Sequence, residues 1–190
     1  KEIKDFSVIG KEKWEPVSKE EFPLEALTPQ AGSRVKKMQE IPVKQVFVTP
    51  QGDTVLDFGQ NLTGWVEVRV KAEEGKEIEL QCFETLDADG NVYIDNLRTA
   101  KQTIKYISNG EERVYHPHFT FQGFQYVKVY KWHTEIEKLL PEDFHACVLY
   151  SEMEQTGTFS CSNPLVNQLQ HNILWGLKGN FVDIPTDCPQ

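Results

Sequence analysis

The sequence predicts a mainly β protein: an antiparallel β-sandwich of the jelly-roll kind, followed by one C-terminal α-helix. Between residues 42 and 150, short segments alternate apolar and polar residues, which is the period of a half-buried strand. Turn-forming residues separate these segments at short intervals, and no helical pattern lies between them. Beyond Ser162 the apolar residues recur every four positions, which is the spacing of one helical face.

The sandwich is expected to consist of short strands that follow one another closely. The predicted strands are residues 43–48, 54–58, 65–70, 77–82, 99–107, 119–121, 124–130 and 144–150, with residues 156–160 as a further candidate. Alternation within residues 65–70 places Val66, Val68 and Val70 on one face of their strand. Asn109-Gly110 is a typical hairpin turn, so the strands on either side of it are expected to pair.

The predicted helix begins and ends at recognisable residues. Asn163 is a good N-cap, Pro164 suits the first helical position, and Gly179 followed by Pro185 ends the helix. Its apolar stripe comprises Leu165, Leu169, Ile173 and Leu177, widened by Val166 and Leu174, with Trp175 on the far side. So wide an arc needs more than one surface to pack against. We therefore expect the helix to be poorly covered by its own chain and to lack a helical partner domain.

The chain divides into three regions. We expect residues 1–41 to be a linker or the tail of a preceding β-domain, because they are charged and Pro16, Pro23 and Pro29 interrupt any periodicity. Within them only residues 6–9 and the neighbourhood of Trp14 are expected to order. Residues 42–155 form the predicted sandwich domain, and residues 156–190 begin a separate helical unit.

The composition argues against two classes of partner. The formal net charge is −9, whereas a nucleic-acid-binding protein normally presents a basic face, so no nucleic acid is expected. No apolar run is long enough to cross a bilayer, so no membrane is expected. The first residues contain no apolar signal-peptide region, and the chain begins without Met. We expect it to be part of a longer protein.

Two motifs could be metal sites, but both favour plainer interpretations. The run D-x-D-G-N at residues 87–91 resembles half of a calcium loop, yet Arg98 stands where such a loop needs a closing Glu. A turn is therefore favoured. His116 and His118 are two apart on an extended segment, but a zinc site needs a third ligand and none is marked. No metal or other cofactor is expected.

Two further sets of residues do not by themselves indicate a chemical reaction. The cysteines are scattered and are expected to be free, mostly buried thiols: Cys82, Cys147, Cys161 and Cys188. Five aromatic residues could form a sugar-stacking platform or belong to the core: Trp65, Tyr106, Tyr126, Tyr130 and Trp132. Aromatic residues of a sandwich more often belong to its core, so the core is favoured.

Several runs in the chain resemble one enzyme family. Residues 57–65, D-F-G-Q-N-L-T-G-W, resemble the D-F-G-Q-N-x-x-G-W signature of bacterial α-L-rhamnosidases, glycoside hydrolase family 78. Residues 117–126 resemble its P-x-F-T-F-x-G-F-R-Y run, with Gln125 where Arg is common. Other matches occur in the family's order: Gly75, Glu84, residues 97–100, Tyr106, and residues 156–165, 172–176 and 184–190. The resemblance covers about residues 42–190.

The resemblance implies a fold and an activity. Residues 42–155 would be a concanavalin-like β-sandwich, and residues 156–190 the truncated start of an α/α-barrel catalytic domain that packs on it. The longer enzyme would hydrolyse terminal α-L-rhamnose from a rhamnose-containing carbohydrate with inversion, in the bacterial cytoplasm or periplasm. Asp187, in the run D-C-P-Q, would bind rhamnose hydroxyls. The general acid and base would lie beyond Gln190, so no catalytic residue is expected in this chain, and the chain alone should be inactive.

Two other interpretations remain for the β-domain. It could be a stand-alone carbohydrate-binding module, or it could be a structural spacer that supports the barrel. A binding module should present Trp or Tyr rings to solvent in a groove, whereas a spacer should bury them.

Overall fold

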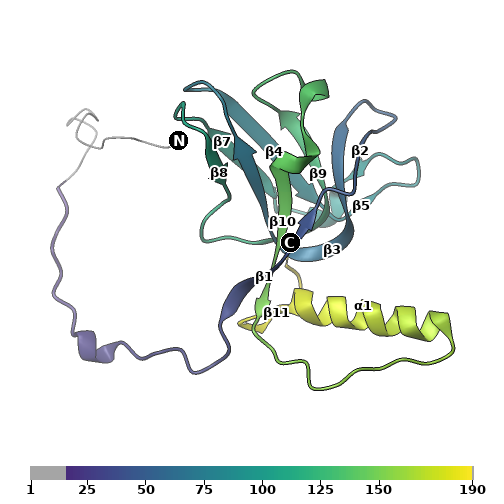
Figure 1. Cartoon of the computed structure of the whole chain (residues 1–190). Helices are drawn as coiled ribbons and strands as arrows, with labels where there is room; N and C mark the ends of the chain where they lie inside the picture. Colours follow the sequence, from purple (N-terminus) through teal and green to yellow (C-terminus); the bar gives the residue numbers. More distant parts are fainter. Residues whose placement is uncertain (1–15, 190) are drawn as a thin grey trace.

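The computed structural model describes residues 16–189, and it is mostly antiparallel β with a single C-terminal helix, as predicted (Figure 1). The expected apolar pieces at residues 6–9 and Trp14 lie outside the described residues. The main strands are β1 (Val35–Pro42), β2 (Gln45–Val48), β3 (Thr54–Val70), β4 (Glu77–Phe83), β7 (Thr103–Ile107), β8 (Arg113–Tyr115), β9 (Gln122–Lys131) and β10 (Phe144–Ser151). The helix is α1 (Pro164–Asn180).

Shorter elements connect these parts. They are the strand pairs β5 (Thr85–Leu86) with β6 (Val92–Tyr93) and β11 (Phe181–Val182) with β12 (Ile184–Pro185), and the 3-10 turns η3 (Leu24–Ala26), η4 (Asp95–Leu97), η5 (Ile136–Lys138) and η6 (Pro141–Asp143). The η4 turn and the β5–β6 pair both lie in the loop between β4 and β7.

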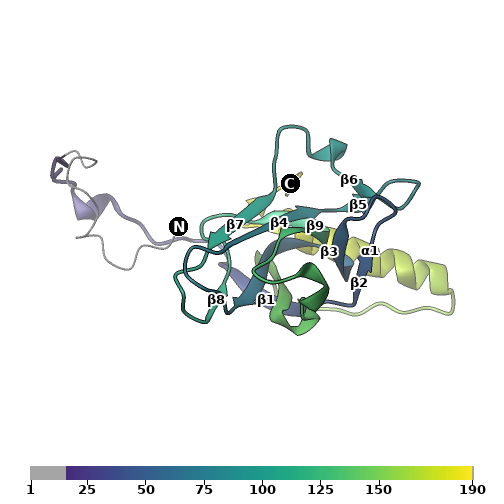
Figure 2. The same ribbon diagram turned by 90° about the horizontal axis from the view of Figure 1, so that it is seen from above.

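The main strands form one eight-stranded sheet that curls around a single core. Its order is β1-β10-β3-β9-β4-β7, with β2 and β8 also paired to β3. Figure 2 shows β3, β9, β4 and β7 lying side by side in that order. The long strand β3 joins the two halves, because it pairs with β2 and β9 in its first part and with β10 and β8 in its last. The two strands predicted at residues 54–58 and 65–70 are therefore one.

The core lies between the curled halves of the sheet. Val66, Val68 and Val70 are all buried, which confirms the face predicted from their alternation. The largest fully buried side chains are Phe83, Phe124 and Phe144, from β4, β9 and β10. Each buried aliphatic or aromatic side chain of this size contributes roughly 1.5–3 kcal/mol to folding, so this cluster is the main source of stability.

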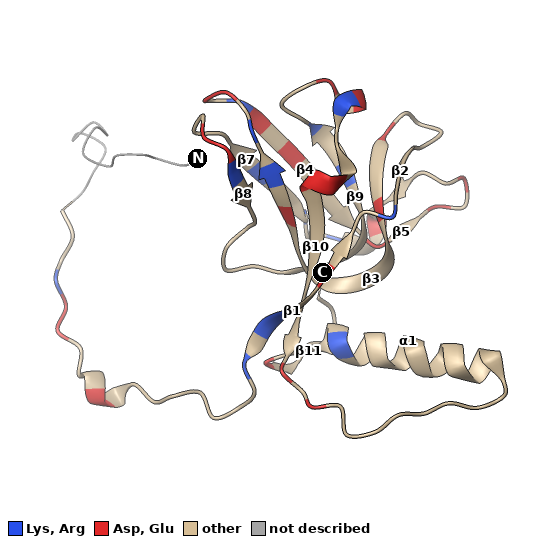
Figure 3. Ribbon diagram, viewed as in Figure 1, with Lys and Arg blue, Asp and Glu red and all other residues tan. Residues whose placement is uncertain are grey.

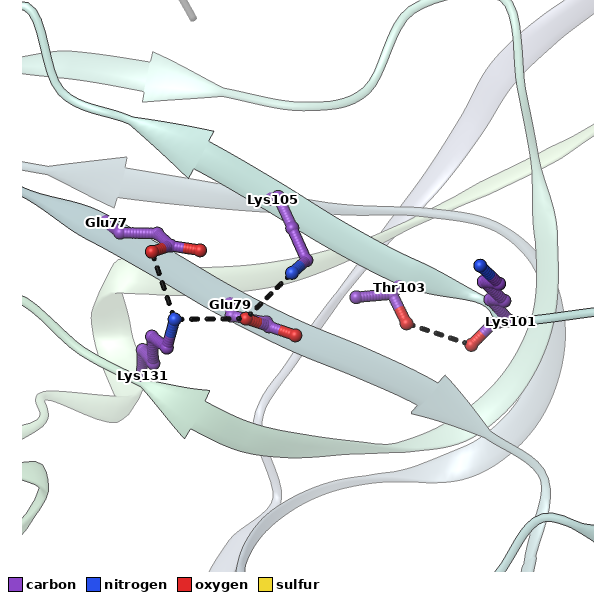
Figure 4. Close-up of polar contacts among 6 residues, drawn as sticks. All are labelled: Glu77, Glu79, Lys101, Thr103, Lys105 and Lys131. Carbon is purple, nitrogen blue, oxygen red and sulfur yellow. Dashed lines mark hydrogen bonds and ion pairs between the residues drawn. The ribbon is translucent and has the colours of Figure 1, made fainter.

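The outer face of β4, β7 and β9 carries ion pairs instead of apolar side chains. Lys131 Nζ lies 3.0 Å from Glu77 Oε2 and 3.5 Å from Glu79 Oε2, and Lys105 Nζ lies 3.1 Å from Glu79 Oε2 (Figure 4). The hydrogen bond from Lys105 holds the pKa of Glu79 below its ordinary value. Such exposed pairs add little stability, but they keep this face polar.

Strand β1 lies partly within the region for which the sequence predicted a linker. It pairs with β10 from Val35 opposite Ser151 to Pro42 opposite His145, so the sheet begins seven residues before the expected boundary at residue 42. The strand escaped detection because it is charged, with Lys36, Lys37 and Glu40 all exposed. An edge strand tolerates such residues, since only one of its sides pairs with a neighbour. Residues 16–34 are all exposed.

Three other local predictions are wrong. The Asn109-Gly110 turn does not close a hairpin, because β7 before it pairs with β4, and β8 after it pairs with β3. Residues 119–121 are not a strand: Phe119 has a φ of 59° and is fully exposed. Residues 156–160 also form no strand. In each case the local pattern was compatible with a strand or hairpin, but strand pairing depends on tertiary context, which a local pattern does not contain.

Helix α1 begins as predicted. The Oδ1 atom of Asn163 accepts a hydrogen bond from the Leu165 amide at 2.9 Å, and Pro164 occupies the first turn. The apolar stripe faces solvent: Leu165 is 77% exposed, Leu169 57% and Ile173 54%. The opposite side, with Trp175, packs on the core next to β3 and β10. In Figure 3 the helix is almost free of charge, with Lys178 in its last turn.

No helix among residues 16–189 is both long enough and apolar enough to cross a membrane.

Candidate functional site

A pocket of about 390 Å³ opens between the β-sheet, helix α1 and the C-terminal segment. Three separate parts of the chain line it. The lining residues are Gln60, Asn61, Leu62, Thr63 and Glu84 from the sheet, Asn172, Trp175, Gly176, Gly179 and Asn180 from the helix, and Asp187 and Pro189 after it. Side-chain amides, two carboxylates and one indole therefore converge here, which is the kind of lining that a polar ligand with an apolar face requires.

Asp187, the residue predicted to bind sugar, lies in this pocket. Its carboxylate is exposed, with Cys188 Sγ donating to Asp187 Oδ2 at 3.7 Å. Just before it, the Thr186 amide donates to the Asn180 carbonyl at 2.7 Å, which ties the segment to the end of the helix. The Asp183 amide donates to Ser151 Oγ at 2.9 Å, which ties the intervening turn to β10.

Glu84 and Asn61 form the sheet side of the pocket, and sequence reasoning did not single them out as site residues. Asn61 Nδ2 donates to Glu84 Oε1 at 3.1 Å, and Asn96 Nδ2 donates to Glu84 Oε2 at 3.2 Å. Each oxygen of this carboxylate thus has one amide partner, which fixes its orientation. The available signal was the D-F-G-Q-N run itself, in which Gln60 and Asn61 follow the bend of β3.

Asp57 begins the same run but has a structural role. Its Oδ1 accepts hydrogen bonds from the Gly59 amide at 2.6 Å and from Gln125 Nε2 at 3.0 Å. Gln125 thus supplies a neutral hydrogen bond at the position where the resembled family commonly has Arg. The two contacts hold the irregular part of β3, between its pairings at Asp57 and Leu62, against β9. This places Gln60 and Asn61 at the pocket.

The two candidate metal motifs take other roles. Asp87 Oδ1 accepts from the Asp89 and Asn91 amides at 2.9 Å and 2.7 Å, so it caps the turn between β5 and β6. His116 stacks on Trp65 with ring centroids 4.6 Å apart and lies next to His118 at 4.8 Å. Among residues 16–189 no cluster of three His, Cys, Asp or Glu side chains could hold a metal ion.

The five candidate aromatic residues do not form a stacking platform. Tyr106 is buried, and Trp65, Tyr126 and Trp132 are half-buried. Tyr130 is 44% exposed, but its hydroxyl donates to Gln81 Oε1 at 2.9 Å and Lys128 Nζ lies 4.3 Å from its ring centroid. The cation therefore occupies one face of the most exposed ring of this set. This arrangement is typical of packing residues.

The thiols divide into a buried and an exposed pair. Burial raises the pKa of Cys82 well above its usual range and that of Cys147 to about 11. Neither carries a thiolate at neutral pH, so neither is an activated nucleophile. Cys161 and Cys188 are exposed. The expectation of mostly buried thiols therefore holds for half of them.

Comparison with known proteins gives the class and then the family. Residues 47–150 match the model of the bacterial α-L-rhamnosidase concanavalin-like domain, and residues 154–190 match that of the bacterial α-L-rhamnosidase 6 hairpin glycosidase domain. The chain thus matches two domain types of one class of glycosidases: the concanavalin-like β-domain and part of the helical domain. It belongs to the bacterial α-L-rhamnosidase family.

Individual relatives agree with this assignment. The chain is 36% identical over 166 residues to an α-L-rhamnosidase of Streptomyces avermitilis, covering 87% of this chain and 16% of that protein. The solved α-L-rhamnosidase of Aspergillus terreus superposes with a TM-score of 0.82 at 43% identity, over 90% of this chain and 20% of that one. A Streptomyces avermitilis α-L-rhamnosidase solved with L-rhamnose superposes with a TM-score of 0.77 at 37% identity, over 84% and 15%. The chain therefore spans about a sixth to a fifth of these relatives.

Proposed function

We propose that this chain is the β-domain and the first barrel helix of an α-L-rhamnosidase, a longer enzyme that hydrolyses terminal α-L-rhamnose with inversion. The observation that carries the proposal is the meeting of Asp187 with the D-F-G-Q-N run in one pocket, in a chain of this family. The two runs are far apart in sequence, and both belong to the motifs through which the chain resembles these enzymes.

In this proposal Asp187 binds hydroxyls of the rhamnose ring. An ionised carboxylate accepts two hydrogen bonds from neighbouring hydroxyls, and such charge-assisted bonds are stronger than neutral ones. The pocket wall contributed by Trp175 is apolar and suits the C–H face of a sugar. Inversion further needs one carboxylic acid to protonate the leaving oxygen and one carboxylate to activate water. We place both of these groups beyond Gln190.

The exposed stripe of helix α1 is proposed to be where the rest of the helical domain packs. Leu165, Leu169 and Ile173 present their apolar side chains to solvent, and the helix is almost uncharged (Figure 3). Contiguous apolar surface of this kind usually marks an interface. Covering it in the longer enzyme would enclose the helix between the β-domain on one side and further barrel helices on the other.

The test is hydrolysis of p-nitrophenyl α-L-rhamnoside by two proteins. A longer protein containing this chain and the rest of the helical domain should release p-nitrophenol and should yield β-L-rhamnose first, as followed by NMR of the anomeric proton. The 190-residue chain alone should release none, because we place the general acid and base outside it, and these groups together contribute several orders of magnitude in rate. Activity towards a different glycoside and none towards the rhamnoside would refute the proposal.

A further inference from the structure

Two close approaches to the sheet fix the segment that carries Asp187. The cross-strand pair Thr63 and Gly123 points away from the core, whereas their neighbours Leu62 and Phe124 are buried in it. Successive residues of a strand face opposite sides, so the outer side of this pair is free to receive other elements. The end of helix α1 and the C-terminal segment both lie there.

The first approach is at Thr63. The Thr63 hydroxyl donates a hydrogen bond to the Gly179 carbonyl oxygen at 3.0 Å. A Cβ atom at Gly179 would lie 3.3 Å from Thr63 Oγ1. The last turn of the helix is thereby held against β3. The Asn180 carbonyl, one residue further on, accepts the Thr186 amide, as described above. The chain before Asp187 is therefore anchored through the helix to β3.

The second approach is at Gly123. A Cβ atom at this position would lie 3.1 Å from Pro189 Cγ, 3.6 Å from the Pro189 carbonyl carbon and 3.4 Å from Glu84 Oε1. The proline ring thus lies directly on the backbone of β9, beside the carboxylate that Asn61 and Asn96 orient. Asp187 sits between the two anchors, one at Thr186 and one at Pro189.

We propose that Gly123 is a positioning residue for Asp187: its missing side chain lets Pro189 seat on β9 and so places the Asp187 carboxylate in the pocket. Gly123 itself does not line the pocket. Its backbone is not in the left-handed region, so alanine fits the strand conformation. The tight contact of the new Cβ is with Pro189, whereas Glu84 Oε1 lies at an ordinary van der Waals distance. The inference rests on the proposed function only in taking Asp187 as a sugar ligand.

The first test uses the chain itself and the exposed thiol next to Asp187. In a Cys161→Ser background, Cys188 is the remaining exposed thiol, because Cys82 and Cys147 are buried. Gly123→Ala should increase the rate at which a disulfide reagent labels Cys188 by about fivefold, since displacing Pro189 loosens the segment and breaks the contact of the Cys188 thiol with the Asp187 carboxylate. The matched control is Gly157→Ala, where a new Cβ would meet nothing within 4 Å and labelling should not change.

A double-mutant cycle separates this mechanism from general loosening of the sheet. If Gly123→Ala acts through Pro189, then adding it to Pro189→Ala should produce no further increase in the labelling rate. The proposal would be overturned if the two substitutions increased the Cys188 labelling rate independently, so that their effects multiplied. It would also be overturned if Gly123→Ala labelled no faster than the Gly157→Ala control. Circular dichroism melting of each variant shows whether the β-domain itself remains folded.

The second test uses the longer enzyme. Gly123→Ala should lower kcat/KM for the rhamnoside about tenfold without lowering the melting temperature, because small displacements of a binding group are costly to catalysis. Unchanged kcat/KM together with faster Cys188 labelling would limit the role of Gly123 to the fold and overturn the positioning role. If the longer enzyme hydrolyses no rhamnoside at all, the proposed function fails, while the labelling experiment still decides whether Gly123 seats Pro189.

Discussion

At the scale of single residues, Asp187 is the position where a small chemical change should have the largest effect on activity. In the longer enzyme, Asp187→Asn replaces one acceptor oxygen with a donor while keeping the shape of the side chain. We expect a loss of about 2–4 kcal/mol in transition-state stabilisation, or roughly 30- to 1,000-fold in kcat/KM. Steady-state kinetics on the rhamnoside measures this. Wild-type kinetics would show that Asp187 is not a sugar ligand, even though the family is right.

Gly64 is the position where a single methyl group should damage the fold most. A Cβ atom there would lie 1.8 Å from the Cys147 carbonyl oxygen, because β3 and β10 approach each other closely where Gly64 pairs with Val148. Backbone cannot yield as a flexible side chain can, so Gly64→Ala should cost about 4 kcal/mol or more, or prevent folding. Urea unfolding measures the loss, with Gly157→Ala as the control. A cost under about 1 kcal/mol would mean that the two strands can separate easily at this point.

At the scale of elements, helix α1 offers two faces that should respond differently to substitution. Leu169 lies on the exposed stripe, so Leu169→Gln should change the free energy of unfolding of this chain by less than about 0.5 kcal/mol. Trp175 packs on the core, so Trp175→Ala should cost about 2–3 kcal/mol. Both are read from urea unfolding of the chain. Equal effects at the two positions would mean that the helix does not dock through its Trp175 face.

Much of the fold could be predicted from local patterns, and the failures have physical causes. The alternating pattern of residues 65–70 correctly predicts the buried face that carries Val66, Val68 and Val70. The capping residue Asn163 correctly predicts the start of the helix. Both signals lie within short stretches of sequence. The charged strand β1 and the Asn109-Gly110 turn were misjudged because pairing partners decide them, and those partners are distant in the chain. The same holds for the site. Asp187 was proposed from the run of residues around it, whereas Glu84 comes to the same pocket only through the folding of the sheet.

At the scale of the whole molecule, the chain should bind free L-rhamnose weakly or not at all. The pocket is open, and a sugar site needs several polar groups around an enclosing apolar wall. Isothermal titration should therefore give no dissociation constant tighter than about a millimolar. The stand-alone carbohydrate-binding interpretation predicts the opposite, and a dissociation constant of about a micromolar or below would favour it.

In the eight-stranded sheet the first strand, β1, pairs with the last, β10, and this has a consequence for how the protein is made. Lys36 on β1 and Glu152 directly after β10 form an ion pair across 116 residues. A ribosome adds about 5–20 residues per second, so β1 waits roughly 6–23 s for β10 to be synthesised. Until then β1 is expected to lack a partner strand, and its charged residues, Lys36, Lys37 and Glu40, should disfavour pairing with other chains, as charges on edge strands do. The charged residues that make β1 look like a linker are therefore expected to reduce aggregation of the chain during its synthesis.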